Sequence, residues 1–216
     1  MIGIFGGTFD PIHFGHLRVA REAMDTLGLQ ALRWVPAFQP PLRAAPVATA
    51  AQRAAMLSLV VGGLAGQQLD TRELERGGVS YTIDTLESLR AEQPDAALCL
   101  LVGRDQFNHF ERWRRWQDIL NLAHLVVLDR PGVAAGDLPE WARARLCADA
   151  QALRHRPAGR LLFLAVSPQE ISATAIRTRL AEHQPVANQV PPGVLDYIYS
   201  NHLYGSAEHG EICKQK

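Results

Sequence analysis

Short apolar runs alternate along this chain with segments in which apolar residues recur at helical spacing. The apolar runs predict five buried strands, over residues 2–5, 32–35, 98–102, 125–128 and 161–166. The remaining periodic segments predict helices over residues 17–27, 51–61, 82–91, 116–122 and 138–153. Regular alternation of strands and helices is typical of a parallel sheet covered by helices on both faces. The pattern therefore predicts an α/β fold with a Rossmann-like, doubly wound parallel sheet and a small C-terminal helical part.

Three turns come directly after predicted strands. They are the glycine turn after Phe5, the Gly103-Arg104-Asp105 turn and the Ser167-Pro168 turn. Ligands of doubly wound sheets bind beyond the carboxyl ends of the strands. We therefore expect one binding site where these turns converge. The proline-rich segment 36–46 also follows a strand, and a mobile substrate loop is an alternative there to a simple surface connection.

Composition narrows the class of protein. The 216 residues suffice for one core, so a single domain over residues 1–216 is predicted, with a tail that frays after about residue 204. The 22 basic and 22 acidic residues give a formal net charge of zero, and hence no electrostatic reason to expect nucleic acid or an anionic membrane as a partner. No apolar stretch reaches the length of about 18 residues that a membrane span needs. The sequence leaves a homo-oligomer open.

The cysteines and the N-terminus bear on location. Three cysteines, an odd number without paired spacing, indicate a reducing compartment. The N-terminus enters a strand at once and lacks the basic segment and long apolar run of a signal peptide. A cytoplasmic location is therefore expected. Cys99, Cys147 and Cys213 are too far apart to form a zinc motif, so no protein-bound metal site is predicted.

The segment between the first predicted strand and the first predicted helix reads Gly6-Gly7-Thr8-Phe9-Asp10-Pro11-Ile12-His13-Phe14-Gly15-His16. Glycines let a backbone approach a ligand closely, and a helix N-terminus offers N–H groups and a positive dipole end to a phosphate. His13 and His16 are three apart and project from one face of the helix start. A solvated histidine and an ordinary turn are the structural alternative. The combination favours phosphoryl or nucleotidyl chemistry.

A second motif, Ile171-Ser172-Ala173-Thr174-Ala175-Ile176-Arg177, follows the last predicted strand. Ser172 or Thr174 is suited to cap a helix, and Thr174 and Arg177 share a face of it. Hydroxyls and a guanidinium at a helix N-terminus can hold a polyphosphate. Taken by itself, this motif is explained better by ordinary helix capping. It indicates a phosphate site only in combination with the first motif.

Together the two motifs resemble the nucleotidylyltransferase superfamily, whose members share a His-x-Gly-His turn and a C-terminal Ser/Thr-rich motif ending in arginine. Within it the chain is similar to the bacterial nicotinate mononucleotide adenylyltransferases, from Ile2 to about Leu203. The further likeness lies in Pro40-Pro41-Leu42-Arg43, Ser80-Tyr81-Thr82-Ile83-Asp84-Thr85-Leu86, Gly103-Arg104-Asp105, Trp113 with Trp116 and Ile119, and Arg130-Pro131-Gly132. The chain departs from the family pattern at Leu42, where histidine is frequent, at Arg114, where tyrosine is common, and at Ala173, where serine is frequent.

The resemblance implies adenylyl transfer from ATP to nicotinate mononucleotide, giving deamido-NAD and pyrophosphate in NAD biosynthesis, with Mg²⁺ bridging phosphates. It implies catalytic roles for His13, His16 and Arg177. The ATP-binding residues it implies are Gly6, Gly7, Thr8, Phe9, His13, His16, Gly103, Asp105, Ser172, Thr174 and Arg177. The residues it implies for nicotinate mononucleotide are Asp10, Arg43, Thr82, Trp113 and Arg114. For Asp10, a role in fixing the turn ranks slightly above contact with a ribose.

Three alternatives stay open from the sequence. Another small-molecule nucleotidylyltransferase, of the pantetheine-phosphate type, shares the His-x-Gly-His turn. A class I aminoacyl-tRNA synthetase core also has such a turn, but this chain is short and lacks a basic excess for tRNA. A non-catalytic nucleotide-sensing module is expected to have lost His13, His16 or Arg177, and all three are present.

Overall fold

The computed structural model describes residues 1–42, 44–129, 138–167 and 170–206. Its centre is a six-stranded sheet in the order β3-β2-β1-β4-β5-β6. Every neighbouring pair of strands is parallel. This is the strand order of a doubly wound Rossmann-like sheet, so the predicted fold class is confirmed. The strands are β1 (Ile2–Gly7), β2 (Ala31–Pro36), β3 (Gln67–Leu69), β4 (Leu98–Gly103), β5 (His124–Asp129) and β6 (Leu161–Ala165).

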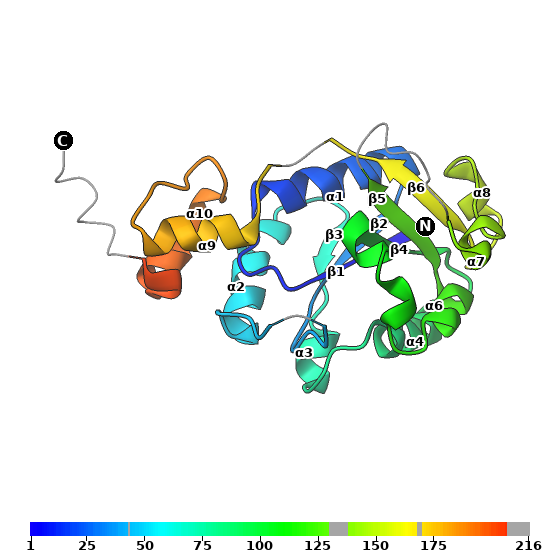
Figure 1. Cartoon of the computed structure of the whole chain (residues 1–216), viewed down its shortest axis with the longest axis horizontal. Coiled ribbons are helices and arrows are strands. Elements are labelled where there is room, and N and C mark those ends of the chain that lie inside the picture. Colours follow the sequence, from blue (N-terminus) through cyan, green and yellow to red (C-terminus); the bar gives the residue numbers. More distant parts are fainter. Residues whose placement is uncertain (43, 130–137, 168–169, 207–216) are drawn as a thin grey trace.

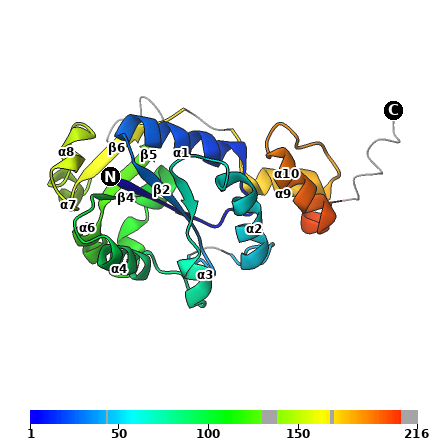
Figure 2. The same cartoon turned by 180° about the vertical axis from the view of Figure 1, so that it is seen from behind.

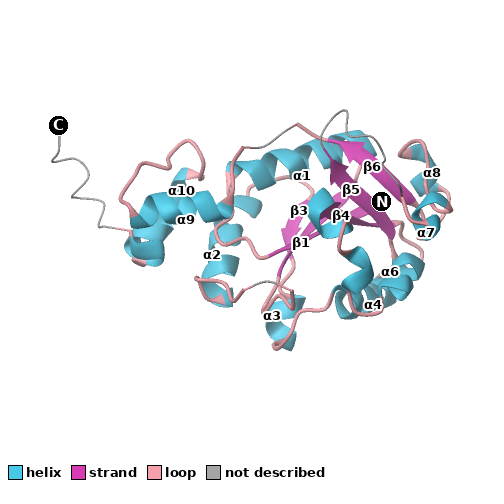
Figure 3. Cartoon of the chain, viewed as in Figure 1, coloured by secondary structure: helices cyan, strands magenta, loops and turns pink. Residues whose placement is uncertain are grey.

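Helices cover both faces of the sheet, as Figures 1 and 3 show. The longer helices are α1 (Phe14–Leu27), α2 (Ala50–Val61), α4 (Thr82–Glu92), α6 (Trp116–Leu122), α9 (Ala173–Ala181) and α10 (Pro192–Ser200). The shorter helices are α3 (Arg72–Arg76), α5 (Arg104–Phe107), α7 (Glu140–Arg143), α8 (Gln151–Arg154) and the 3₁₀ turns η1 (Phe110–Arg112) and η2 (Leu203–Gly205). Of the helices in the described ranges, none is long and apolar enough to cross a membrane.

The central strands β1 and β4 carry no charged residue, as expected of strands buried on both faces. Successive residues of β4 enter different cores. Leu100 packs with α4 and α6 in one cluster, and Cys99 and Leu101 pack with α1 and α2 in the other. Each core therefore takes every second residue of the strand, as the two-residue repeat of a strand requires.

The sequence prediction missed several short elements and has one helix wrong. Strand β3 and helix α3 were not predicted, because their sequences Gln-Gln-Leu and Arg-Glu-Leu-Glu-Arg carry no apolar run. The single helix predicted over residues 138–153 is instead the two short helices α7 and α8. Between them Leu146 forms a parallel bridge with Leu161 of β6, so pairing with the sheet edge overrides local helical propensity.

The C-terminal helices lie at one end of the molecule, beyond α2 and opposite α7 and α8 (Figures 1 and 2). Helix α10 packs against α2, and η2 packs against α9. The buried apolar residues of this part continue one of the two cores, namely Ile176, Leu180, Val186, Val190, Val194 and Ile198. The arrangement brings the N-terminus of α9 next to the segment between β1 and α1. The tail predicted to fray falls mainly on residues 207–216, outside the described residues.

Candidate active site

A cleft of about 1290 Å³ opens at the carboxyl ends of β1 and β4. Here the strand order reverses, which is where doubly wound sheets bind ligands. The cleft brings together most of the predicted site residues, namely Gly6, Gly7, Thr8, Phe9, Asp10, His13, His16, Thr82, Gly103, Asp105, Trp113, Arg114, Thr174 and Arg177. Ser172 is not among the lining residues, and Arg43 lies outside the described residues. The positions 130–132, Pro168 and Cys213 also lie outside them.

Close packing shapes the end of β1, which extends through Gly6 and Gly7, and the turn that follows it. A Cβ atom on Gly7 would lie 2.8 Å from the Phe9 ring, and Phe9 itself has a positive φ of 50°. At Gly6 a Cβ atom would meet no protein atom within 4 Å. Packing therefore requires glycine at position 7, whereas the open side of Gly6 faces space that a ligand can enter.

His13 and His16 form a stacked pair at the start of α1. Their ring centroids are 3.7 Å apart with an angle of 26° between the rings. The rings of His16 and Phe9 also pack edge to face. His13 is the N-cap residue of α1, so the helix begins three residues earlier than predicted. His13 is buried, and this burial lowers its pKa from 6.5 to about 4. His13 is therefore a neutral hydrogen-bonding group at pH 7.

The lowered pKa of His13 predicts a pH dependence of stability. Between pH 6.5 and pH 4 the unfolded chain binds a proton at this residue and the folded chain does not. The free energy of unfolding should therefore fall as the pH falls through this window, by about 3 kcal/mol in total. Urea unfolding at several pH values should give a shallower dependence for His13→Gln than for the parent, whereas the exposed control His155→Gln should match the parent. If the stability of the parent and of His13→Gln depended equally on pH, the pKa of His13 would not be lowered in the folded protein.

Asp10 connects four segments of the chain around the turn. Its carboxylate accepts hydrogen bonds from the N–H groups of Val47 (2.8 Å) and Ala48 (3.1 Å) and from the Tyr204 hydroxyl (2.7 Å). Its carbonyl oxygen accepts from Nη1 of Arg177 at 2.8 Å. Asp10 is 5% exposed. These contacts favour the interpretation that Asp10 fixes the turn, and contact with a ribose stays a prediction.

The first turns of α9 place Arg177 and Thr174 in the same cleft as the histidine pair. Nη2 of Arg177 lies 3.4 Å from Oγ1 of Thr174, so the two residues share one face of the helix, as predicted. Ser172 is the N-cap, and its Oγ accepts a hydrogen bond from the Ala175 N–H at 3.1 Å. The Ser172 hydroxyl is thus engaged in capping, while Thr174 and Arg177 line the cleft.

The opposite end of the cleft has an aromatic wall. Helix α4 begins at Thr82, as predicted, and Trp113 follows η1 and packs against the Phe110 ring at 5.3 Å. The guanidinium of Arg114 lies 4.6 Å above the ring of Tyr81. The predicted ring-binding residues Trp113, Arg114 and Thr82 therefore line the same cleft from two different segments.

Sequence reasoning missed Arg53, which supports the turn from α2. Arg53 is 1% exposed, and it donates hydrogen bonds to the carbonyl oxygens of Thr8 (2.7 Å), Phe38 (3.1 Å) and Ala48 (3.2 Å). Burial lowers its pKa, and the charge of Asp10 opposes that shift. An arginine within an otherwise apolar helical pattern was the available signal, because such a residue is buried only when its donors are satisfied.

Arg104 was also not predicted as a site residue, although it lies in the predicted Gly103-Arg104-Asp105 turn. Its Nη1 forms an ion pair with Asp129 at 2.8 Å, and its guanidinium carbon lies 5.1 Å from the Phe163 ring centroid. Among the described residues, the arginines that line the cleft are Arg104, Arg112, Arg114 and Arg177. A cleft with these cations and the N-termini of α1, α4 and α9 suits an anionic ligand.

Comparisons with known proteins show the family to which this chain belongs. The cytidylyltransferase-like family model matches residues 4–179. A probable nicotinate-nucleotide adenylyltransferase of Acidithiobacillus ferrooxidans is 46% identical over 207 residues, which is 94% of this chain and 95% of the relative. One from Laribacter hongkongensis is 48% identical over 211 residues, or 95% and 94% of the two chains. The solved Plasmodium falciparum nicotinic acid mononucleotide adenylyltransferase complexed with NaAD has a TM-score of 0.70 at 16% identity, covering 95% of this chain and 98% of that one.

The Rossmann-like fold, the cationic cleft and the family match together define a nucleotidyltransferase. The chain belongs to the cytidylyltransferase-like family and, within it, to the nicotinate-nucleotide adenylyltransferases. The family resemblance seen in the sequence is therefore confirmed. The solved structure, at 16% identity, supports the fold.

Proposed function

We propose that this protein transfers the adenylyl group of ATP to nicotinate mononucleotide, forming deamido-NAD and pyrophosphate. The observation that carries the proposal is the stacked His13–His16 pair at a helix N-terminus, in the same cleft as the wall formed by Trp113 and Thr82. One end of the cleft offers donors for phosphates, and the other offers an aromatic surface for a flat ring. The family relationship supports the same reaction.

The reaction needs positioning more than a strong base. A phosphate oxygen of the mononucleotide attacks the α-phosphorus of ATP and forms a new P–O bond. The bond between the α-phosphorus and the oxygen that bridges it to the β-phosphate breaks, and pyrophosphate leaves with that oxygen. The nucleophile is already an anion, so the protein must align the reactants and neutralise charge. His13 and His16 donate hydrogen bonds to the phosphates in the transition state. Arg177 and Thr174 hold the β- and γ-phosphates as they depart.

The remaining predicted residues divide between the two nucleotides. Gly6, Gly7, Thr8 and Phe9 present backbone groups to them, and Gly103 and Asp105 face the ribose and adenine of ATP. Trp113 stacks on the pyridine ring. The nicotinate carboxylate accepts from the backbone N–H groups of Thr82 and Arg114, the first of which lies at the start of α4. Arg43 is the proposed partner of the mononucleotide phosphate.

Magnesium is proposed to accompany ATP. Among the described residues, four carboxylates line the cleft, and each already accepts a hydrogen bond from the protein: those of Asp10, Glu73, Asp105 and Asp129. This donor set fits an ion that is bound mainly by phosphate oxygens and water, which Mg²⁺ prefers. When bound, Mg²⁺ supplies further neutralisation of phosphate charge.

A cytoplasmic location is proposed for the reaction. The support comes from Cys99 and Cys147, which are free thiols in the structure. Free thiols are typical of reducing compartments.

Selectivity for the acid over the amide is the first consequence of this geometry. Backbone N–H groups pair with a carboxylate but oppose the amide's own N–H₂ group, and each opposed polar group costs about 1–3 kcal/mol. Two such contacts predict a preference of roughly a hundredfold for nicotinate mononucleotide over nicotinamide mononucleotide in kcat/KM. Because Arg114 stacks on Tyr81, the Arg114→Tyr variant should keep most of this preference. Collapse of the ratio in that variant alone would show that the side chain, and not the backbone, selects the acid.

A panel of acceptors tests the proposed function. The purified protein is incubated with ATP and nicotinate mononucleotide, nicotinamide mononucleotide or phosphopantetheine, and pyrophosphate and the dinucleotide product are measured. We expect the highest kcat/KM with nicotinate mononucleotide. A preference for phosphopantetheine would assign the protein to the other nucleotidylyltransferase type. Tight ATP binding without pyrophosphate release from any acceptor would indicate a sensor.

A further inference from the structure

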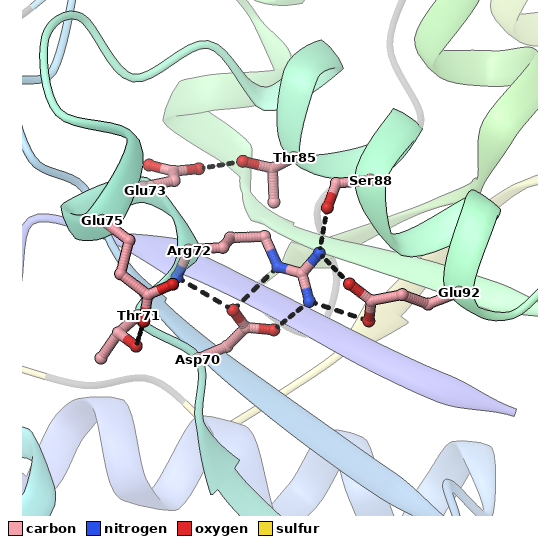
Figure 4. A network of polar contacts seen from close by, with 8 residues as sticks. All are labelled: Asp70, Thr71, Arg72, Glu73, Glu75, Thr85, Ser88 and Glu92. Atoms are coloured by element: carbon pink, nitrogen blue, oxygen red, sulfur yellow. Dashed lines mark hydrogen bonds and ion pairs between the residues drawn. The ribbon is translucent and has the colours of Figure 1, made fainter.

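Glu73 is a buried carboxyl group that faces the cleft from α3 and that no motif in the sequence singles out. Its side chain is 8% exposed and lines the cleft. The Thr85 hydroxyl on α4 donates a hydrogen bond to its Oε1 at 2.6 Å, and Figure 4 shows this contact between the two helices. Burial raises the pKa of the Glu73 carboxyl, and hydrogen bonds from Thr85 and Ser80 oppose the shift. Burying a carboxyl group costs free energy, which the two hydroxyl partners offset. The presence of this group in the cleft therefore calls for a functional reason.

The second partner, Ser80, connects Glu73 to the loop after β2. The Ser80 Oγ accepts a hydrogen bond from the Phe38 N–H at 2.9 Å. The Ser80 N–H donates to the carbonyl oxygen of Gln39, also at 2.9 Å. Since Oγ accepts from Phe38, its proton is available to the Glu73 carboxyl. The carboxyl group therefore joins two walls of the cleft, the loop after β2 and the first turns of α4.

A separate set of contacts fastens α3 to α4 outside the cleft. Nη1 of Arg72 donates to Ser88 (2.6 Å) and to Glu92 (2.9 Å), and Nε of Arg72 donates to Asp70 (2.8 Å). In Figure 4 these contacts lie further along α4 than the Glu73–Thr85 bond. None of these four residues is among those that line the cleft. The attachment of α3 is therefore secured by Arg72, and Glu73 is placed to act on the cleft itself.

We propose that Glu73 is a positioning residue for the acceptor, which holds the start of α4 and the loop after β2 at the spacing that the nicotinate ring and carboxylate require. This proposal rests on the proposed function, because it concerns the acceptor end of the same cleft. Thr82 begins α4, three residues before Thr85. A small displacement of this turn would misplace the Thr82 N–H relative to the carboxylate, and displacements of about 1 Å are costly in enzymes.

The test compares Glu73→Ala and Glu73→Gln with two controls. Glu75→Ala makes the same substitution on the exposed side of α3, and Arg72→Ala removes the other attachment of that helix. We expect Glu73→Ala to raise KM for nicotinate mononucleotide by about tenfold, while KM for ATP and kcat change little. Glu73→Gln keeps one carbonyl acceptor and the shape of the side chain, so it should fold and show a smaller rise. Arg72→Ala should lower the Tm, and both controls should leave the KM for the mononucleotide unchanged.

The outcomes separate this inference from the proposed function. If the parent does not use nicotinate mononucleotide, the proposed function fails. If the parent uses it but Glu73→Gln and any folded Glu73→Ala protein keep the parental KM and only lose stability, Glu73 is merely structural and the inference is wrong. An equal rise in KM for ATP and for the mononucleotide would also overturn it. Calorimetric titration of each variant with nicotinate mononucleotide gives the same comparison without turnover.

Discussion

Replacing His16 with alanine is expected to lower kcat by about a hundredfold or more while the protein remains folded. His16 lies in the first turn of α1 and stacks on His13, with the ring centroids 3.7 Å apart, so packing holds its ring at the helix end where we propose that the phosphates bind. Donors that act on charge developing in the transition state typically contribute this much to turnover. Steady-state kinetics with ATP and nicotinate mononucleotide measure the loss.

Two further variants make this result specific. His16→Gln keeps one N–H donor and should recover part of the lost turnover. His155→Ala changes an exposed histidine far from the cleft and should match the parent. A folded His16→Ala protein with near-parental kcat would contradict the catalytic role of His16.

The largest expected loss of stability follows substitution of Asp10. Asp10→Ala leaves the Tyr204 hydroxyl and the N–H groups of Val47 and Ala48 without their acceptor, in a site where Asp10 is 5% exposed. Burial and the hydrogen bond to Asp10 raise the pKa of Tyr204, so the phenol stays a donor. Removing one member of a buried charged network costs about 3–5 kcal/mol. Urea unfolding should show this loss, and activity should fall because the Asp10 carboxylate also pairs with Nη1 of Arg177, with Oδ2 at 3.9 Å.

The matched control for Asp10 is Asp25→Ala. The Asp25 ion pair with Arg21 is 3.9 Å long, and both side chains are at least 75% exposed. Exposed pairs of this kind contribute about 0–1 kcal/mol, so this variant should be nearly as stable as the parent. A similar, small loss in both variants would show that the Asp10 contacts do not hold the turn.

Much of this architecture was predictable because it is local. The strands around Ile4 and Leu100 are continuous apolar runs, which only a sheet buried on both faces explains. The glycine turn and the histidine pair lie within eleven consecutive residues, so their spacing alone placed them together. The N-cap role of Ser172 likewise depends on a residue three positions away.

The missed residues depend on partners far away in the sequence. Tyr204 and Asp10 are 194 positions apart, and Arg53 and Thr8 are 45 apart. Glu73 lies in a short polar helix with no periodic pattern, and its importance appears only when Ser80 and Thr85 surround it. The role of a buried polar side chain is inferred from its hydrogen-bond partners, and the tertiary fold determines which residues these are.

A crystal structure with bound deamido-NAD tests the central claim most directly, because the dinucleotide occupies both halves of the proposed site. The account predicts that the pyridine ring stacks on Trp113 and that its carboxylate accepts from the Thr82 N–H. It also predicts that the adenylyl phosphate lies within hydrogen-bond reach of His16, about 3 Å. A dinucleotide whose pyridine lies away from Trp113, or whose phosphates do not contact His13 or His16, would contradict it.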